Sequence, residues 1–234
     1  MTFSVVLICS IAVVLVSKPL IKKYAIAFYA LALLFDVLFI VDRWMPLPAL
    51  LGDFIYICIQ RCTLSLALFV LVMYVGIFKK DSRIRNYLMP IRKELSIEAC
   101  FLAIGHMVNY LFAYAARAIT NFAGLQLNIA TSLVVSLILF ALLIVLGITS
   151  FDFVKKHMST KNWKNLQKLS YLFFMLVYVH VLLFLLPSAM QGGSTAQISV
   201  VVYSVIFIFY ASAKIVLVLR SPKDQKGQLE AAAR

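Results

Sequence analysis

Residues 168–187, KLSYLFFMLVYVHVLLFLLP, decide the fold of this chain. This apolar run is about as long as the roughly 20 residues that a helix needs to cross a bilayer. Its interior carries a single histidine, His180, and a second apolar run, SIEACFLAIGHMVNYLF at residues 96–112, carries His106. An imidazole in hydrocarbon is costly unless it has a partner, so both histidines are candidate functional groups.

The rest of the chain is equally apolar. Of its 234 residues 64% are hydrophobic and its mean hydropathy is +0.99, whereas a soluble domain has about 45 to 50% apolar residues. The chain therefore predicts an all-α, polytopic transmembrane helix bundle of about seven spans. The predicted spans are residues 2–17, 24–41, 54–78, 95–116, 128–150, 168–187 and 197–219.

The domain predicted from these spans is single and covers residues 1–225. The first span lacks a basic n-region and a small-residue cleavage site, so it is predicted to be retained rather than removed as a signal peptide. Residues 226–234 are a polar, helix-prone tail, which we interpret as an added remnant outside the domain.

The net charge of +13 indicates topology rather than nucleic-acid binding. Lysines and arginines gather in alternate connections, while the other connections are nearly neutral. By the positive-inside rule the basic connections are cytoplasmic, which predicts the N-terminus outside and the C-terminus inside. They would also contact anionic lipid. The basic segments are KPLIKK, KKDSRIRNYLMPIRKE, FVKKHMSTKNWKNLQK and LRSPKDQK. We expect a multi-pass protein of a bacterial inner membrane or a plasma membrane.

Two opposite charges, Asp36 and Arg61, fall inside predicted spans. Counting residues from the nearest loop charges at 1.5 Å per residue places both in the outer half of the bilayer. One interpretation is an ion pair that joins the second and third spans. The alternative is that Arg61 binds a haem propionate or an anionic headgroup, since guanidinium suits carboxylate bidentately.

The two histidines match in depth. His106 lies 13 residues beyond Lys93 and His180 lies 12 beyond Lys168, so each is roughly 18 to 20 Å from the inner surface. Their spans run in the same direction, so the imidazoles could clamp a haem between two helices. The alternative is that each histidine only hydrogen-bonds a neighbouring helix.

Other polar residues give weaker signals. Tyr110 and Arg117 share the His106 face and are candidate haem surroundings, although such residues are also common at membrane interfaces. His157 lies in a basic loop and is predicted to be solvated, or to contact a cytoplasmic partner. Cys58 and Cys62 share a face without a second pair for a metal site. We predict no catalytic residues, because no acid pair, triad or nucleotide-binding loop is present.

The segment Trp163–His180, WKNLQKLSYLFFMLVYVH, resembles a ligand helix of the ferric-reductase-type transmembrane family. That helix reads Trp, two residues, Leu, His, Arg, Leu, one residue, Tyr and Leu before a second His. The residues that fit are Trp163, Leu166, Lys168, Leu169, Tyr171, Leu172 and His180. The segment IRKELSIEACFLAIGHMVNYL is similar to the other ligand helix, matching at Arg92, Lys93, Leu95, His106 and Tyr110. The resemblance spans about residues 54 to 220.

The resemblance implies haem b and electron transfer. By size the chain is most similar to the haem-binding membrane subunits that serve periplasmic methionine sulfoxide reductases. Full members hold two haems on histidine pairs about fourteen and thirteen residues apart, but Arg92 and Gln167 stand at the inner positions here. The resemblance therefore implies one haem, with His106 and His180 as axial ligands, toward the outside.

One haem in the outer half limits the electron donors. Quinol that reaches the haem laterally is the simpler supply, and an inner flavin, a cytoplasmic flavin reductase or a second membrane subunit is the alternative. The expected acceptor is an extracytoplasmic redox protein. The chain is then an electron-transfer subunit rather than a stand-alone enzyme. A different class remains open, a non-haem transporter or assembly protein that uses His106, His180, Asp36 and Arg61.

Overall fold

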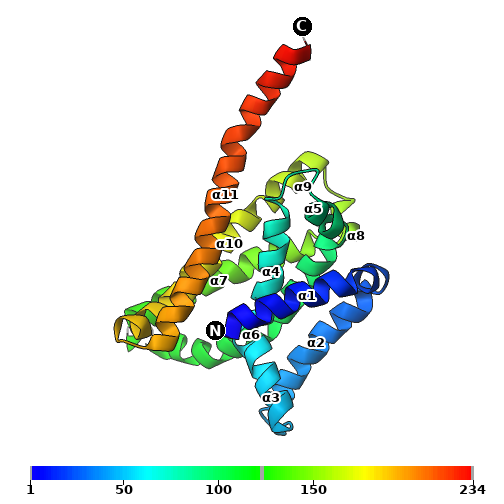
Figure 1. The fold of residues 1–234 in the computed structure, drawn as a ribbon. Helices are drawn as coiled ribbons and strands as arrows, with labels where there is room; N and C mark the ends of the chain where they lie inside the picture. Colours follow the sequence, from blue (N-terminus) through cyan, green and yellow to red (C-terminus); the bar gives the residue numbers. More distant parts are fainter. Residues whose placement is uncertain (1, 122–123, 233–234) are drawn as a thin grey trace.

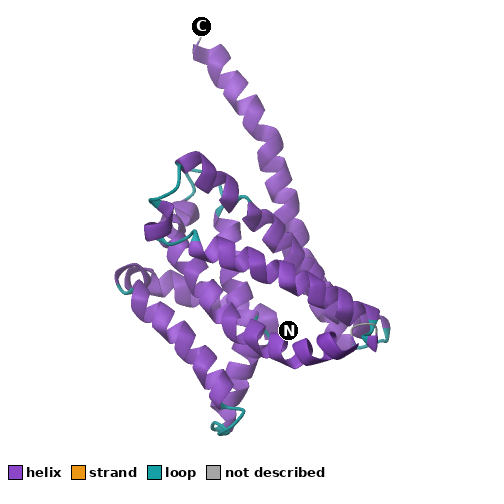
Figure 2. Cartoon of the chain, turned by 180° about the vertical axis from the view of Figure 1, so that it is seen from behind, coloured by secondary structure: helices purple, strands orange, loops and turns teal. Residues whose placement is uncertain are grey.

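The computed structural model describes residues 2–121 and 124–232, apart from the side chains of residues 115–118 and 221–232. Every regular element in these ranges is helical, which confirms the all-α bundle (Figure 2). The elements are α1 (Thr2–Lys23), α2 (Ala25–Val41), α3 (Ala49–Ile55), η1 (Tyr56–Gln60), α4 (Thr63–Val75), α5 (Arg83–Leu88), η2 (Met89–Ile91), α6 (Arg92–Asn121), α7 (Leu127–Ile148), α8 (Asp152–Lys155), α9 (Thr160–Gln167), α10 (Leu169–Met190) and α11 (Ser194–Ala232).

Each of the seven predicted segments is helical, and together they form a multi-pass membrane protein. Within the described chain, five helices are long and apolar enough to span by themselves: Thr2–Lys23, Arg83–Asn121, Leu127–Ile148, Thr160–Met190 and Ser194–Arg220. The pair Ala49–Gln60 and Thr63–Val75 is bent by 47° and makes a sixth if it is one span. Since α2 is a shorter apolar helix of 17 residues, the count of seven and the orientation stay predictions.

The first basic connection is not a loop. Its residues, KPLIKK, belong to α1, which continues past Pro19 and ends at Lys23. Lys22 and Lys23 occupy the last turn, where their charges complement the negative end of the helix dipole. The connection to α2 is therefore reduced to Tyr24.

Helix α4 lies at the centre of the bundle. Ten of its 13 residues are buried, on all sides of the helix, as expected of a helix enclosed by others. It contributes to all three apolar clusters of the core, through Leu68 to the first, Leu66 to the second and Phe69 to the third. The other spans pack around it and expose apolar faces outward.

Two groups of helices meet at α4 (Figure 1). On one side α10 packs against both α7 and α11, and on the other α2 packs against α6, while α4 itself contacts α6 and α1. The rings of Phe69 and Phe173, 5.1 Å apart between centroids, join α4 to α10. This packing brings α6 and α10, the helices with the two histidines, to the same part of the bundle.

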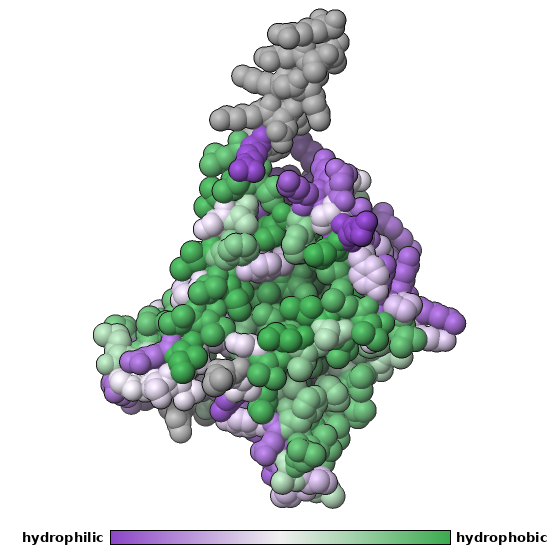
Figure 3. Space-filling model, in the orientation of Figure 1, coloured by the Kyte–Doolittle hydropathy of each residue, from purple (hydrophilic) through white to green (hydrophobic). Residues whose placement is uncertain are grey.

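The surface is divided along the length of the bundle (Figure 3). Apolar side chains cover its middle, and hydrophilic residues gather at the end where α5, α8 and α9 lie. That end carries most of the basic connections. Such an apolar belt beside a basic end is what a helix bundle needs in order to sit in a bilayer.

Candidate functional site

His106 is oriented by a backbone carbonyl of another element. It lies half-buried on α6, and its Nδ1 is 2.7 Å from the carbonyl oxygen of Gln60, the last residue of η1. A carbonyl oxygen only accepts, so Nδ1 carries the proton and donates it. The other ring nitrogen, Nε2, is therefore left with a free lone pair.

The Gln60 carbonyl is available because the helix breaks there. Residues Tyr56–Gln60 form a π-helix, and Cys62 follows in the left-handed region with φ 53°, the one such non-glycine residue in the described ranges. That conformation costs roughly 1 to 2 kcal/mol for an L-residue. The hydroxyl of Thr63 donates to the Ile57 carbonyl at 2.8 Å and covers another freed group. Single π-helical turns occur often at functional sites.

This break corrects the sequence prediction of one continuous span over residues 54–78. The stretch has no proline, and its one glycine, Gly76, lies outside the break. The one sequence signal near the break is Arg61, a charge in the middle of an apolar run.

His180 is oriented by two serines of α7. Its Nδ1 lies 3.2 Å from the hydroxyl oxygens of both Ser132 and Ser136. Ser136 already donates its own hydrogen to the Ser132 carbonyl at 2.7 Å, so its oxygen can only accept from His180. If Nδ1 of His180 carries the proton, as Nδ1 of His106 does, its Nε2 also offers a lone pair.

The two imidazoles have similar surroundings. The helices that carry them meet in one apolar cluster, through Ala103 of α6 and Phe173 of α10. Each imidazole has an aromatic neighbour one turn along its own helix: Tyr110 at 4.8 Å from the His106 ring and Phe184 at 5.2 Å from the His180 ring, between centroids. Arg117, the other candidate neighbour, has a side chain outside the described residues.

The predicted ion pair between Asp36 and Arg61 is wrong. Asp36 is 5% exposed and neither of its carboxylate oxygens has a hydrogen-bond partner among the described residues. Arg61 is the residue after the π-helix, and its side chain is exposed. Its guanidinium lies 5.2 Å from the centroid of the Tyr56 ring.

Asp36 instead packs against the backbone beside His106. A Cβ built on Gly105 would lie 2.5 Å from Oδ1 of Asp36 and 2.8 Å from Cγ2 of Ile59 in the π-helix. Glycine suits position 105, because α2, η1 and α6 meet there and a methyl group would require the buried side chains of Asp36 and Ile59 to shift. The contact holds α6 close enough for His106 to reach Gln60.

We expect Asp36→Asn to raise the thermal unfolding midpoint of the detergent-solubilised protein. An unpaired buried carboxyl costs about 1 to 3 kcal/mol, and asparagine removes the charge with almost no change of volume. Asp53→Asn is the control, because Asp53 is exposed and should leave the midpoint unchanged. A lower midpoint for Asp36→Asn would show that the carboxylate has a partner.

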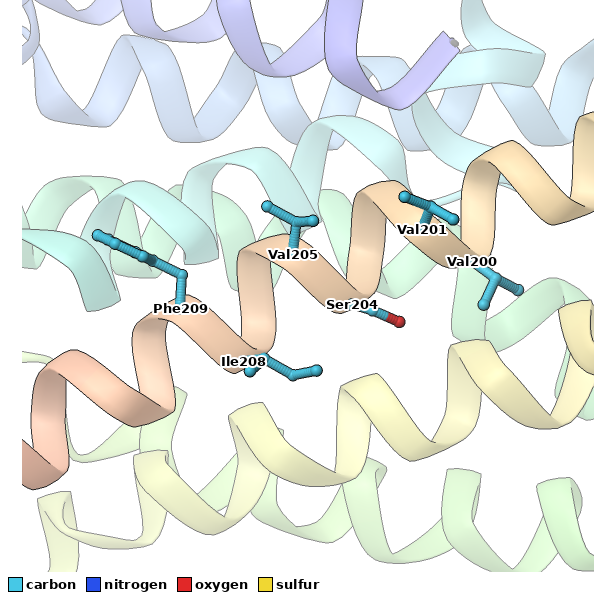
Figure 4. Close-up of a pocket in the computed structure, with 6 residues that line it drawn as sticks. All are labelled: Val200, Val201, Ser204, Val205, Ile208 and Phe209. Carbon is cyan, nitrogen blue, oxygen red and sulfur yellow. The ribbon is translucent and has the colours of Figure 1, made fainter.

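The remaining candidate residues make other contacts. His157 is exposed, and its Nδ1 contacts the Phe153 carbonyl at 2.6 Å. Cys58 is buried and Cys62 half-buried, both as free thiols. A groove on α11, lined by Val200, Val201, Ser204, Val205, Ile208 and Phe209, faces outward, and Ser204 points toward α10 (Figure 4). The Ser204 and Tyr178 hydroxyls are 2.7 Å apart.

The donor set at the histidine pair fits a haem better than a bare metal ion. In the described part of the chain no three histidine, cysteine or carboxylate side chains come together as a metal group. Two imidazoles with free Nε2 atoms suffice where a porphyrin supplies the other four ligands. A hydrogen bond from Nδ1 to an acceptor is the usual way in which a protein orients such a ligand.

The two inner positions are already engaged by protein groups. Arg92 donates from Nε to the Val72 carbonyl at 3.0 Å, and Gln167 donates from Nε2 to the hydroxyl of Thr149 at 3.1 Å. Neither side chain is a good iron ligand. In this chain the residues that could hold a haem are therefore those of the outer pair.

Comparison with known proteins gives a family match. A family model described as Ferric reductase like transmembrane component matches residues 61–178, half of the chain. The match contains His106 and ends two residues before His180. An uncharacterized protein of Treponema pallidum (strain Nichols) is 34% identical over 157 residues, which are 67% of this chain and 43% of that protein. The chain thus spans less than half the length of that relative. No solved structure matches the chain.

Proposed function

Because this chain belongs to the ferric reductase like transmembrane component family, we propose that it is a membrane cytochrome b that holds one haem between His106 and His180. The observation that carries the proposal is the set of contacts that the two imidazoles make. Nδ1 of each ring contacts oxygen atoms of a neighbouring element, the Gln60 carbonyl or the Ser132 and Ser136 hydroxyls. With Nδ1 engaged in this way, Nε2 of each ring is available to bind iron.

In this proposal several groups of the chain have separate roles at the site. The π-helical break presents the Gln60 carbonyl, the serine pair of α7 orients His180, and Gly105 sets the distance between α6 and the break. A bound haem b would supply one-electron redox chemistry. With both axial positions taken by imidazole, the site favours outer-sphere electron transfer over chemistry on a bound substrate.

The proposed electron path starts within the membrane. Arg92 and Gln167 replace an inner ligand pair, so electrons from a donor on the cytoplasmic side would have to reach the proposed haem without an inner haem between them. Quinol arriving through the lipid is the simplest donor, and an inner flavin or a partner subunit is the alternative. Electrons would leave to a redox protein outside the membrane.

The likeness in size and motifs to the haem subunits of periplasmic methionine sulfoxide reductase systems supports an electron-transfer subunit rather than a complete enzyme. In this proposal the chain lies in a bacterial inner membrane or plasma membrane, with its N-terminus outside. The relative in Treponema pallidum adds no activity, because it is itself uncharacterized.

A reduced-minus-oxidised optical spectrum of the purified chain tests the proposal, with haem quantified as the pyridine haemochrome. We expect about one haem b per chain and reduction of that haem by a soluble quinol. Two haems per chain would show that the inner site is retained. Protein without haem after reconstitution would contradict the cytochrome.

A transporter is the second candidate, and two observations favour it. Helices broken within the membrane and unpaired intramembrane charges are both features of transport sites. The chain has a break at Cys62 and an unpaired Asp36. The same spectrum distinguishes the two candidates, since a transporter of this kind would be colourless.

A further inference from the structure

Arg92 lies in a cluster of cations and phenols at the basic end of the bundle. Its half-buried guanidinium bonds to the Val72 carbonyl of α4 at 3.0 Å, and Tyr74, two residues further along α4, lies 5.7 Å from Tyr210 of α11 between ring centroids. Lys214 of α11 joins the cluster, with its Nζ 4.8 Å from the centroid of the Tyr171 ring. Helices α6, α10 and α11 thus bring two positive charges, those of Arg92 and Lys214, to the same end of the bundle as the hydroxyl groups of Tyr171 and Tyr210.

No carboxylate balances these charges in the described part of the chain. The ion pairs there both belong to Lys93, the residue next to Arg92, which lies 3.6 Å from Glu94 and 2.7 Å from Asp152. The hydrogen bond from Lys93 holds the pKa of Asp152 below its usual range. Adjacent residues of α6 thus differ: one cation is paired with acids, and the other is not.

The hydrogen bonds that Arg92 and Arg85 make within the protein use few of the N–H donors of their guanidinium groups. Arg92 Nε donates to the Val72 carbonyl at 3.0 Å, and Arg85 Nη1 donates to the Phe78 carbonyl at 3.2 Å. A guanidinium has five N–H donors in a fixed fork, so most of the fork of Arg92 remains for another acceptor. An anion with several oxygens matches such a fork, and phosphate matches it especially well.

We propose that Arg92, Lys214 and the Tyr171 hydroxyl bind a phosphate-bearing anion at the basic end of the membrane domain. Arg92 would supply a bidentate fork, Lys214 a point charge and Tyr171 a hydroxyl donor. Two sources of this chemistry reach the site: the headgroup of an anionic phospholipid and a free phosphate from solution. The proposal does not depend on haem.

Thermal unfolding of the full chain in a neutral detergent tests this site. In one arm phosphatidylglycerol is titrated against phosphatidylcholine, and in the other inorganic phosphate is titrated against chloride at equal ionic strength. We expect one of the two phosphates to raise the midpoint, and the arm in which it does so identifies the source. No rise in either arm would overturn the proposal.

Two variants localise the effect. Arg92→Gln should weaken the apparent affinity for the stabilising phosphate about tenfold, because a charge-assisted hydrogen bond is lost. Lys214→Gln should weaken this affinity as well. Because Lys214 lies farther from the core, this variant still tests the site if Arg92→Gln does not fold. Lys93→Gln is the matched control, because it removes the same charge from the next residue and should leave the affinity unchanged.

If Lys93→Gln weakens the affinity for phosphate equally, the basic end attracts phosphate by its overall charge, and the proposal of a specific site is contradicted. The haem content of Arg92→Gln is measured in the same samples and should equal that of the unmodified chain. Loss of phosphate binding with haem retained therefore separates this site from the proposed cytochrome.

Discussion

Replacing either His106 or His180 by alanine is expected to abolish the low-spin haem spectrum of the purified protein. Each variant leaves iron with one protein ligand, and the depth-matched partner cannot supply the second bond from its own helix. The measurement is the optical spectrum of oxidised and dithionite-reduced protein, with haem quantified per chain.

His157→Ala is the control for this pair, because His157 is exposed and bonds only within its own loop. Its spectrum should match that of the unmodified chain. A normal low-spin spectrum in either His106→Ala or His180→Ala would contradict the bis-histidine site. These variants are compared with unmodified protein that shows the low-spin spectrum. Unmodified protein without haem would contradict the cytochrome itself rather than the choice of ligands.

Gly105→Ala is expected to have the second largest effect, although it adds a single methyl group. The new Cβ would meet Oδ1 of Asp36 at 2.5 Å and Cγ2 of Ile59 at 2.8 Å. Overpacking of this kind typically costs about 1 to 3 kcal/mol, and here the two buried side chains are expected to push α6 away from the π-helix. His106 would then lose its bond to Gln60, so haem content should fall together with the thermal midpoint.

Gly147→Ala is the matched control, since it places the same methyl group in a transmembrane helix of the bundle. Its Cβ would lie 3.4 Å from Sγ of Cys100, a contact that a small shift of the thiol relieves. It should change both measurements much less than Gly105→Ala does. Equal effects of the two variants would mean that position 105 has no particular role in holding His106.

The amino-acid sequence by itself determined the class of this protein and the positions of its helices. Apolar runs of about bilayer length are dictated by composition, so each predicted segment is helical and the all-α membrane bundle is confirmed. The motifs around His106 and His180 indicated the family, which the match over residues 61–178 shows. The alternation of basic connections predicted an orientation that awaits measurement.

Only the tertiary structure decided what each polar group contacts inside the bundle. Asp36 and Arg61 agree in depth along their helices, yet rotation of α2 and the break at Cys62 leave them apart. The bond between His106 and Gln60 joins residues 46 positions apart. Linear periodicity gives depth and face, but a π-helical turn and a contact in which a methyl group would displace buried side chains depend on how three helices pack, so the sequence alone could not reveal them.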